Sequence, residues 1–369
     1  MFVYWGRRGA LPQFALQLGR VALSDRLIEP TISVSRQNES FERFEEFGPA
    51  LFAVDTFATN SGAFHRAGRI PLLRRSLSQR LRQDRTQVVI ELMPHVWSSL
   101  VMPVSRKVGV RYCTVVHDAD AHPGDRGSLL NRLNDRAAAS ADLVLTLSSA
   151  VASRLAATGK VARDKLMTLF HPDLAYGLPR LRPPPKPGEP VRLLFLGRIL
   201  PYKGLPVFCD AVDRLRSEGM AVEIGVFGEG PLGASAGRLA SMGAKVVNRW
   251  LTAQEFGDVL DRYHAVVLSH TEASQSGVAA AAFGSSVPVV ASPVGGLVEQ
   301  VETGVTGVLA ERADAPALAE AIKQLVLNPT FYRETCANIQ RTAEQRSMKR
   351  FVSRAVSHAV QAIEVDEHS

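Results

Sequence analysis

The sequence predicts an α/β protein built from two Rossmann-like domains. Short apolar runs that suit strands buried on both faces alternate with longer segments of helical apolar spacing, as in parallel βαβ units. The length of 369 residues suggests two domains of ordinary size. The segment 178–190 contains six prolines and is the clearest break in composition. We therefore expect a first domain over 1–175, a linker over 176–190, a second domain over 191–340 and a final helical segment over 341–369.

Composition narrows the class of protein. No run of about 18 apolar residues is present, so we expect no transmembrane helix, and the apolar start precedes its arginines, the reverse of a signal peptide. Three distant cysteines, Cys113, Cys209 and Cys336, argue against a disulfide framework or a metal cluster and favour buried thiols in the cytoplasm. The net charge of +7 is compatible with nucleic acid, anionic lipid or a phosphorylated substrate, and it does not choose among them.

The first domain is predicted to place polar loops at the carboxyl ends of its strands. Strands are expected at 2–5, 31–34, 51–54, 87–93, 112–116 and 141–145, with a helix over 11–23 after the first. Gly6 and Gly9 form the turn between the first strand and its helix, a common approach for phosphate. An ordinary tight turn explains these glycines equally well.

His117 is the best catalytic candidate in this half, because it follows the strand at 112–116 directly. Its neighbours Asp118, Asp120 and His122 also suggest a metal, but their spacing matches no closed zinc site, and we expect none. His95 is more consistent with a structural or acceptor-facing role.

Residues 66–85 contain seven arginines and one aspartate, with apolar residues at helical spacing. A basic amphipathic helix of this kind can lie on an anionic membrane surface. It can equally be a domain helix whose apolar stripe packs on the sheet while its arginines face water, and the two interpretations are compatible. Because aromatic interleaving and nucleic-acid motifs are lacking, we expect no nucleic-acid partner.

The second domain begins with a strand over Val191–Leu196, followed by a turn that carries Gly197, Arg198 and Lys203. Fixed cations at a strand end can hold a diphosphate and stabilise its charge as it leaves. Two exposed turn cations are the simpler alternative.

The strand Val222–Phe227 leads into Gly228, Gly230 and Gly233, which together match GxGxxG. We do not expect dinucleotide binding here, because Pro231 interrupts the motif and the next strand, 245–247, is followed by no acid for a ribose. Beyond that strand, Thr252 and Glu255 have the spacing of a capping box.

The stretch 263–309 organises the domain. Its strand over 264–268 ends in a polar cluster that contains Glu272, and a small-residue helix follows over Gly277–Gly284. Ligands bind outside the carboxyl ends of strands in open α/β sheets, and a helix start presents free N–H groups that suit phosphate. The expected donor-binding residues of this loop are Ser274, Gln275, Ser276, Gly277 and Val278. Because a carboxylate repels phosphate, Glu272 is expected to face sugar hydroxyls.

These motifs resemble the donor site of retaining glycosyltransferases of family 4. The residues that carry the resemblance are Glu272, Ser276, Gly277, the run 288–292, Gly295, Gly296, Glu299 and the Arg198–Lys203 pair. The resemblance implies the GT-B architecture, in which two Rossmann-like domains face each other across a cleft and the last helices return to the first domain. It implies that Arg198 and Lys203 hold the diphosphate of a nucleotide sugar, that His117 contacts the donor sugar, and that no metal is required. Gly6, Gly9, Gly228 and Gly230 would then lie near the nucleotide.

One departure from the family pattern concerns the ribose. The family's second glutamate corresponds to Ala279 or Ala280 here. The Ser-Gln-Ser-Gly loop resembles bacterial exopolysaccharide transferases, including mannosyltransferases. We therefore expect a metal-independent hexosyltransferase that acts on a glycan or lipid-linked glycan in polysaccharide biosynthesis, in the cytoplasm or peripherally on the inner membrane face. The alternatives are a nucleotide-sugar epimerase and an inactive scaffold or binding subunit.

Overall fold

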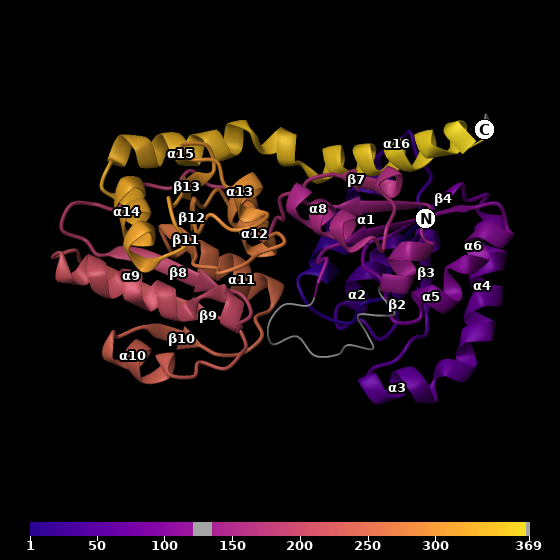
Figure 1. Cartoon of the computed structure of the whole chain (residues 1–369), viewed down its shortest axis with the longest axis horizontal. Coiled ribbons are helices and arrows are strands. Elements are labelled where there is room, and N and C mark those ends of the chain that lie inside the picture. Colours follow the sequence, from indigo (N-terminus) through magenta and orange to yellow (C-terminus); the bar gives the residue numbers. More distant parts are fainter. Residues whose placement is uncertain (121–134, 367–369) are drawn as a thin grey trace. The chain divides into compact units, whose positions relative to one another are not determined.

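The computed structural model describes residues 1–120 and 135–366. Contacts divide these residues into two compact units. Unit 1 comprises residues 1–120, 135–170 and 348–366, and unit 2 comprises His171–Ser347. Each unit contains one fully parallel sheet with helices packed on it (Figure 1).

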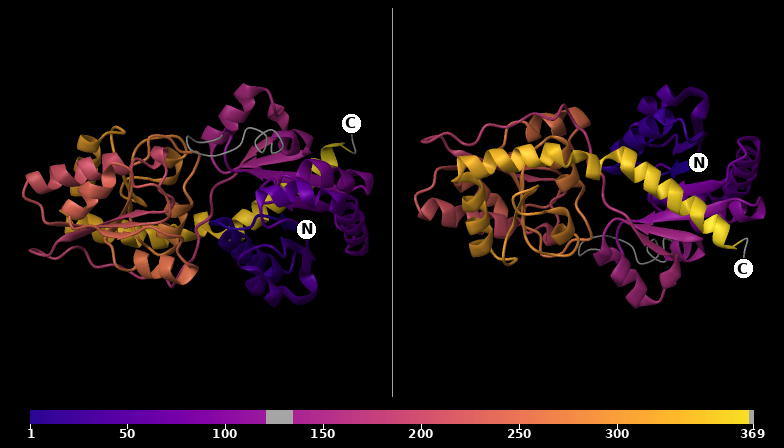
Figure 2. Two further views of the ribbon diagram at one scale, coloured as in Figure 1. Left: turned by 90° about the horizontal axis from the view of Figure 1, so that it is seen from below. Right: turned by 90° about the horizontal axis from the view of Figure 1, so that it is seen from above.

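In unit 1 the described residues form a seven-stranded sheet of order β3-β2-β1-β4-β5-β6-β7. Its strands are β1 (Phe2–Tyr4), β2 (Ile32–Ser35), β3 (Leu51–Val54), β4 (Val88–Glu91), β5 (Arg111–Val116), β6 (Leu143–Thr146) and β7 (Leu166–Thr168). Its α-helices are α1 (Leu11–Ser24), α2 (Phe41–Phe44), α3 (Asn60–His65), α4 (Ile70–Gln83), α5 (Ser98–Val101), α6 (Pro103–Lys107), α8 (Ser149–Thr158) and α16 (Met348–Asp366), and residues 135–140 are also helical. The last helix, α16, packs against α1, β4, β5 and β6, so the end of the chain belongs to the first unit (Figure 2).

In unit 2 the sheet is six-stranded, with the order β10-β9-β8-β11-β12-β13. Its strands are β8 (Val191–Leu196), β9 (Val222–Phe227), β10 (Lys245–Val247), β11 (Ala265–Leu268), β12 (Val289–Ala291) and β13 (Gly307–Leu309). Its α-helices are α9 (Leu205–Ser217), α10 (Ser235–Ser241), α11 (Ala253–Leu260), α12 (Gly277–Gly284), α13 (Leu297–Gln300), α14 (Ala315–Val326) and α15 (Pro329–Arg341), with short 3-10 turns at η4 (Pro201–Lys203) and η5 (Ala343–Arg346).

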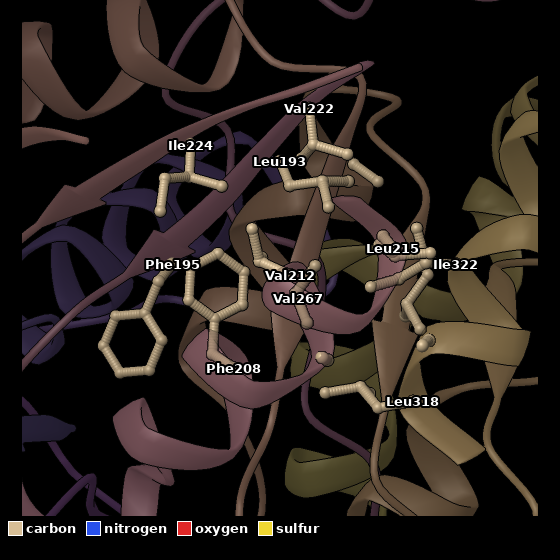
Figure 3. Close-up of a cluster of buried hydrophobic side chains, with 14 of the residues drawn as sticks. Leu193, Phe195, Phe208, Val212, Leu215, Val222, Ile224, Val267, Leu318 and Ile322 are labelled. Atoms are coloured by element: carbon tan, nitrogen blue, oxygen red, sulfur yellow. The ribbon is translucent and has the colours of Figure 1, made fainter. Parts of the chain in front are cut away.

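Both faces of the unit 2 sheet are buried. Since alternate residues of each strand point to opposite sides, each strand contributes side chains to both cores. Leu193 and Phe195 of β8 pack with Phe208 of α9 and Leu318 of α14 in one core cluster (Figure 3). Leu194 and Leu196 belong to a second cluster on the other face, which includes Ala279, Ala281 and Ala282 of α12. This two-sided burial explains why the strands are continuous apolar runs in the sequence.

The predicted capping box and the predicted buried thiols are confirmed. The Thr252 hydroxyl accepts from the Glu255 amide and the Glu255 carboxylate accepts from the Thr252 amide, so the capping box of α11 is complete. The three cysteines are buried free thiols. No described helix has the length and apolar character that crossing a bilayer would need.

The contacts place the division between the units a few residues from the sequence-based boundaries, at 170/171 and 347/348. Residues after 170 already pack on unit 2, since the ring centroids of Tyr176 and Phe256 are 4.5 Å apart. Within the proline-rich segment, Arg182 forms an ion pair with Asp261 at 2.8 Å. The proline-rich segment is thus held on unit 2.

Unit 1 contains a buried carboxylic acid at the carboxyl end of β4. Glu91 is fully buried and accepts hydrogen bonds from the hydroxyls of Ser98 and Tyr112 and from the His95 amide. Burial raises the pKa of Glu91 from its ordinary value of 4.5 to about 7, and the hydrogen bonds oppose this rise only in part. The folded protein therefore favours the neutral, protonated form of Glu91.

The contribution of Glu91 to the stability of unit 1 is predicted to fall as the pH rises from about 4.5 through 7. A raised pKa in the folded state stabilises the protein fully below the unfolded value and progressively less above it, by up to about 3 kcal/mol for a shift of this size. Glu91→Gln, which stays neutral, is expected to flatten this dependence. Denaturation between pH 5 and 8, followed by Trp5 and Trp97 fluorescence in a Trp250→Phe background, measures it. Equal pH profiles for both proteins would contradict the prediction.

Candidate functional site

The strand order of unit 2 reverses between β8 and β11. The chain runs outward from β8 through β9 to β10, then returns to place β11 on the other side of β8. Ligands of open α/β sheets bind at such a switch point, outside the carboxyl ends of the strands. The loops that leave β8 and β11 here are 197–204 and 269–276, and they contain most of the predicted donor-site residues.

The two loops are locked together through their backbones. Gly204 has φ +68°, and a Cβ there would lie 1.8 Å from the Ser269 carbonyl oxygen, so only glycine fits. The Ser269 hydroxyl is 3.1 Å from the Lys203 carbonyl oxygen and 2.9 Å from that of Gly204. On the other side, the Thr271 amide donates to the Tyr202 carbonyl at 2.8 Å.

Lys203 and Arg198 are the two cations of this edge. Arg198 is exposed and Lys203 is half-buried. The Lys203 Nζ lies 2.8 Å from Nε2 of His270 and 5.0 Å from the centroid of the Tyr202 ring. His270 is a site residue that sequence reasoning missed. The signal that could have revealed it is its place at the end of β11, two residues before Glu272.

The start of α12 faces the same edge. Ser276 is the N-cap, and its hydroxyl accepts from the Ala279 amide at 3.2 Å. Its own amide donates to the Gln300 side chain at 2.6 Å, and Gln300 donates back to the Ser276 carbonyl at 3.3 Å. The amides of Gly277 and Val278, in the first helical turn, are therefore the ones oriented for an anion. Gln300 is a second residue that the sequence did not indicate.

Gly295 and Gly296 pack against the loop that contains Glu272. Gly295 has φ +48°, and a Cβ there would lie 1.7 Å from the Ala273 carbonyl oxygen, while the Gly296 amide donates to that oxygen at 3.1 Å. Glu272, Ser274 and Gln275, the loop residues beside this contact, are half-buried. Glu299 lies on the exposed side of α13.

The GxGxxG run packs against the loop after β8 and does not begin a helix. At Gly228 and Gly230 a Cβ would lie 1.9 Å from the Gly197 carbonyl oxygen and 2.1 Å from that of Ile199. The following helix, α10, begins only at Ser235, so the motif lacks the helix start that a dinucleotide fingerprint requires. A Cβ at Gly197, which has φ +102°, would lie 3.0 Å from Val278 of α12. Gly197, Gly228, Gly230 and Val278 are thus gathered at one place.

Ala279 and Ala280, at the position where a second glutamate was considered, are both buried. Ala279 is 0% and Ala280 1% exposed, and the Ala280 carbonyl accepts from the Leu174 amide at 3.0 Å. This part of α12 faces the interior of unit 2 and offers no carboxylate to a ribose.

The remaining predicted residues lie in unit 1. His117 follows β5, and its Nε2 lies 2.8 Å from the Leu92 carbonyl oxygen, which can only accept, so Nε2 carries the proton. Burial lowers the pKa of His117 below 6.5, against the effect of that hydrogen bond, so the ring is neutral at pH 7. Gly6 follows β1, where a Cβ would lie 2.6 Å from the Tyr4 hydroxyl, and Gly9 has φ +118°. These two glycines meet the needs of a tight turn.

Metal ligation finds no support among the residues described. Within residues 1–120 and 135–366, no group of three or more His, Cys, Asp or Glu is placed to hold an ion. His122, one of the side chains weighed above, lies outside the described residues.

Comparison with known proteins agrees with this geometry. Residues 190–328 match the family model described as glycosyl transferases group 1. A D-inositol 3-phosphate glycosyltransferase of Rhodococcus erythropolis is 34% identical over 174 residues, covering 44% of this chain and 39% of that protein. One of the same name from Saccharomonospora viridis is 31% identical over 231 residues, covering 54% and 52%. The chain thus spans about half or less of the length of these curated relatives.

Solved structures share the fold over nearly the whole chain. Anabaena HepE in complex with UDP and glucose has a TM-score of 0.71 at 15% identity, covering 98% of both chains. Sucrose-phosphate synthase from Thermosynechococcus elongatus has a TM-score of 0.70 at 14% identity, covering 99% of this chain and 98% of that one. The predicted fold class is confirmed: the chain has two parallel, Rossmann-like α/β units of the GT-B type.

Gly204→Ala is predicted to destabilise unit 2 far more than Gly243→Ala. Both glycines have nearly the same positive φ, +68° and +66°, but nothing lies within 4 Å of a Cβ at Gly243. The control should therefore cost only the backbone penalty, about 1 kcal/mol. Gly204→Ala adds a backbone clash with Ser269, and we expect a loss of about 3 kcal/mol or more. Chemical denaturation followed by far-UV circular dichroism measures both, and equal losses would contradict a backbone contact here.

Proposed function

We propose that this protein is a glycosyltransferase that moves a sugar from a nucleotide-sugar donor to a glycan or lipid-linked glycan. The observation that carries the proposal is the convergence of Arg198, Lys203 and the start of α12 at the β8/β11 switch point. The glycosyl transferases group 1 match covers this same part of the chain, residues 190–328. The GT-B fold of the whole chain supports the same conclusion.

The geometry suits a diphosphate leaving group. As the bond from the sugar to the diphosphate breaks, negative charge grows on the departing oxygens. Arg198, Lys203 and the first-turn amides of Gly277 and Val278 would stabilise this charge. Since these groups supply positive charge themselves, we infer that the reaction needs no bound metal.

The donor sugar is assigned to Glu272 and His117. Glu272 lies beside the phosphate-binding groups, and its carboxylate suits sugar hydroxyls. The neutral His117 contributes from unit 1 and keeps its orientation through the Leu92 carbonyl. No side chain of the unit 2 site stands out as a nucleophile, so we infer front-face displacement with retention of configuration.

The acceptor is inferred to lie at an anionic membrane surface, reached through α4. This helix buries Leu73, Leu77 and Leu81 in the core of unit 1. The sequence predicted one basic helix over 66–85. In the structure, residues 67–69 form a separate 3-10 turn before α4 begins. The burial of the apolar stripe in the core, part of one of the two interpretations of this segment, is thus observed.

The opposite side of α4 has the composition of a lipid-contacting surface. Arg75 and Arg82 of α4 are exposed, as is Arg69 immediately before the helix, and Leu72 is 68% exposed. Arg80 is different, because it pairs with Asp84 at 2.7 Å and donates to the Pro49 carbonyl at 2.9 Å. The remaining arginines are therefore available to anionic headgroups while Leu72 contacts the acyl boundary.

A binding subunit without activity is the second candidate function. It is favoured by Ala279 and Ala280, because an alanine offers no carboxylate to a ribose. The retained Arg198, Lys203 and Glu272 favour an enzyme. A nucleotide-sugar epimerase of the same architecture would need no acceptor and would release no diphosphate, so product analysis separates it. Mannosyl transfer into an exopolysaccharide remains our expectation from the Ser-Gln-Ser-Gly loop.

Nucleoside diphosphates are predicted to stabilise the protein against heat. A ligand at one hundred times its Kd adds about 2.7 kcal/mol to the stability of the folded state. UDP, GDP and ADP and their sugars form the panel, with UDP first because it is bound in the Anabaena HepE structure. Arg198→Ala and Lys203→Ala should each weaken diphosphate binding about 10- to 100-fold.

Lys245→Ala is the matched control for these two variants. Lys245 is an exposed cation of the same unit, but it lies at the amino end of β10, at the opposite edge of the sheet. Its removal should leave diphosphate affinity unchanged. Full binding and activity in Lys203→Ala would refute the phosphate assignment, and a protein that binds no nucleotide would favour the binding-subunit alternative.

Binding to anionic vesicles is predicted to depend on the outer face of α4. Each basic residue near such a surface contributes about 1 kcal/mol, so replacing Arg69, Arg75 and Arg82 by Gln should weaken binding about 100-fold at low salt. The control replaces three exposed arginines elsewhere in unit 1, Arg26, Arg136 and Arg163, and changes the net charge equally. Co-sedimentation with phosphatidylglycerol vesicles measures both. Equal losses would show a general charge effect and not a surface on α4.

A further inference from the structure

The end of β11 holds a histidine that the mechanism above does not use. His270 is 3% exposed, and its Nε2 lies 2.8 Å from the Lys203 ammonium. The Tyr202 ring packs edge-on against it at 6.1 Å and also lies beneath the ammonium, at 5.0 Å. Lys203 is therefore held by two rings that belong to the two loops of the switch point.

The neighbours of His270 hold its backbone in a defined position. Ser269 bonds to the carbonyls of Lys203 and Gly204, and Thr271 bonds to the carbonyl of Tyr202. Both residues that flank the imidazole are thus tied to the turn that carries the lysine. A lysine side chain is otherwise a flexible stem with many rotamers. The imidazole supplies a fixed acceptor that selects one position for its charge.

We propose that His270 is the positioning residue for Lys203, and that it orients the ammonium toward the diphosphate without neutralising it. An ammonium only donates hydrogen bonds, so Nε2 accepts and the neutral ring carries its proton on Nδ1. A carboxylate at this position would also orient the lysine, but it would cancel the charge that the phosphate needs. A neutral acceptor leaves the full positive charge for the anion. This inference rests on the proposed function of the site.

The proposal that a neutral acceptor orients Lys203 predicts how substitutions of His270 rank by their UDP affinity. His270→Gln keeps a neutral acceptor and should bind UDP within about threefold of the natural protein, whereas His270→Phe should lose about tenfold. His270→Glu should lose at least as much as His270→Phe, although it retains an acceptor. A residue with only a packing role would give the opposite order, with phenylalanine the least harmful change. The control is His264→Phe, which removes a buried histidine at the amino end of β11 and should leave UDP affinity unchanged.

A double-mutant cycle tests whether His270 acts through Lys203. In a Lys203→Ala background, His270→Phe should cause no further loss of UDP affinity, because the group that it positions is absent. The same variant should lower kcat more than it changes KM for the donor, since charge on the diphosphate grows toward the transition state. Losses that simply add would overturn the proposal. Calorimetry with UDP, and with inorganic pyrophosphate as a base-free probe, gives the affinities.

A measurement on the unliganded protein separates this inference from the function on which it rests. Long-range nitrogen–proton NMR spectra report which imidazole nitrogen carries the proton. We expect the Nδ1–H form for His270, and a change in the Nε2 resonance when Lys203 becomes alanine. An Nε2–H ring would refute the positioning role whatever the protein binds. Failure of UDP, GDP, ADP and pyrophosphate to bind would refute the proposed function, while the tautomer would still decide whether His270 holds the lysine.

Discussion

The structure of the site depends on a close backbone approach at the carboxyl edge of the unit 2 sheet. The loops after β8 and β11 meet where the strand order reverses, and Gly204 lies directly against the Ser269 carbonyl. Gly228, Gly230 and Gly295 permit three further contacts of the same kind. Because each leaves no space for a Cβ, the glycines bring polar loops together that side chains would hold apart.

The electrostatics of the site follow from this packing. Two cations of one loop meet a helix start that is distant in the chain, which suits an anion with several oxygens. The immediate partner of Lys203 is an imidazole, so the positive charge of the site is oriented and retained. Glu272 follows in the same loop, and we propose that its carboxylate faces the hydroxyl groups of the donor sugar.

Unit 1 uses charged and acidic residues in two distinct ways. Glu91 is buried among hydroxyl groups and stabilises the loop after β4 in its neutral form. The arginines of α4 divide by position, since Arg80 binds Asp84 and a backbone carbonyl, whereas Arg75 and Arg82 face outward. One amphipathic pattern in the sequence therefore supports both the packing of the helix and the surface that we assign to lipid.

The sequence by itself determined the local elements and the types of residue at the site. The strands Val191–Leu196 and Val222–Phe227, the helix Gly277–Gly284 and the capping box at Thr252 occur as predicted, because apolar periodicity and cap chemistry act over a few residues. Only the tertiary structure decided the partners: His270 beside Lys203, Gln300 on the Ser276 amide, and the carboxylate of Glu91 among buried hydroxyls. These contacts join residues that are 67, 24 and 21 positions apart. They arise because strand order determines which loops meet, and no local pattern in the sequence encodes that order.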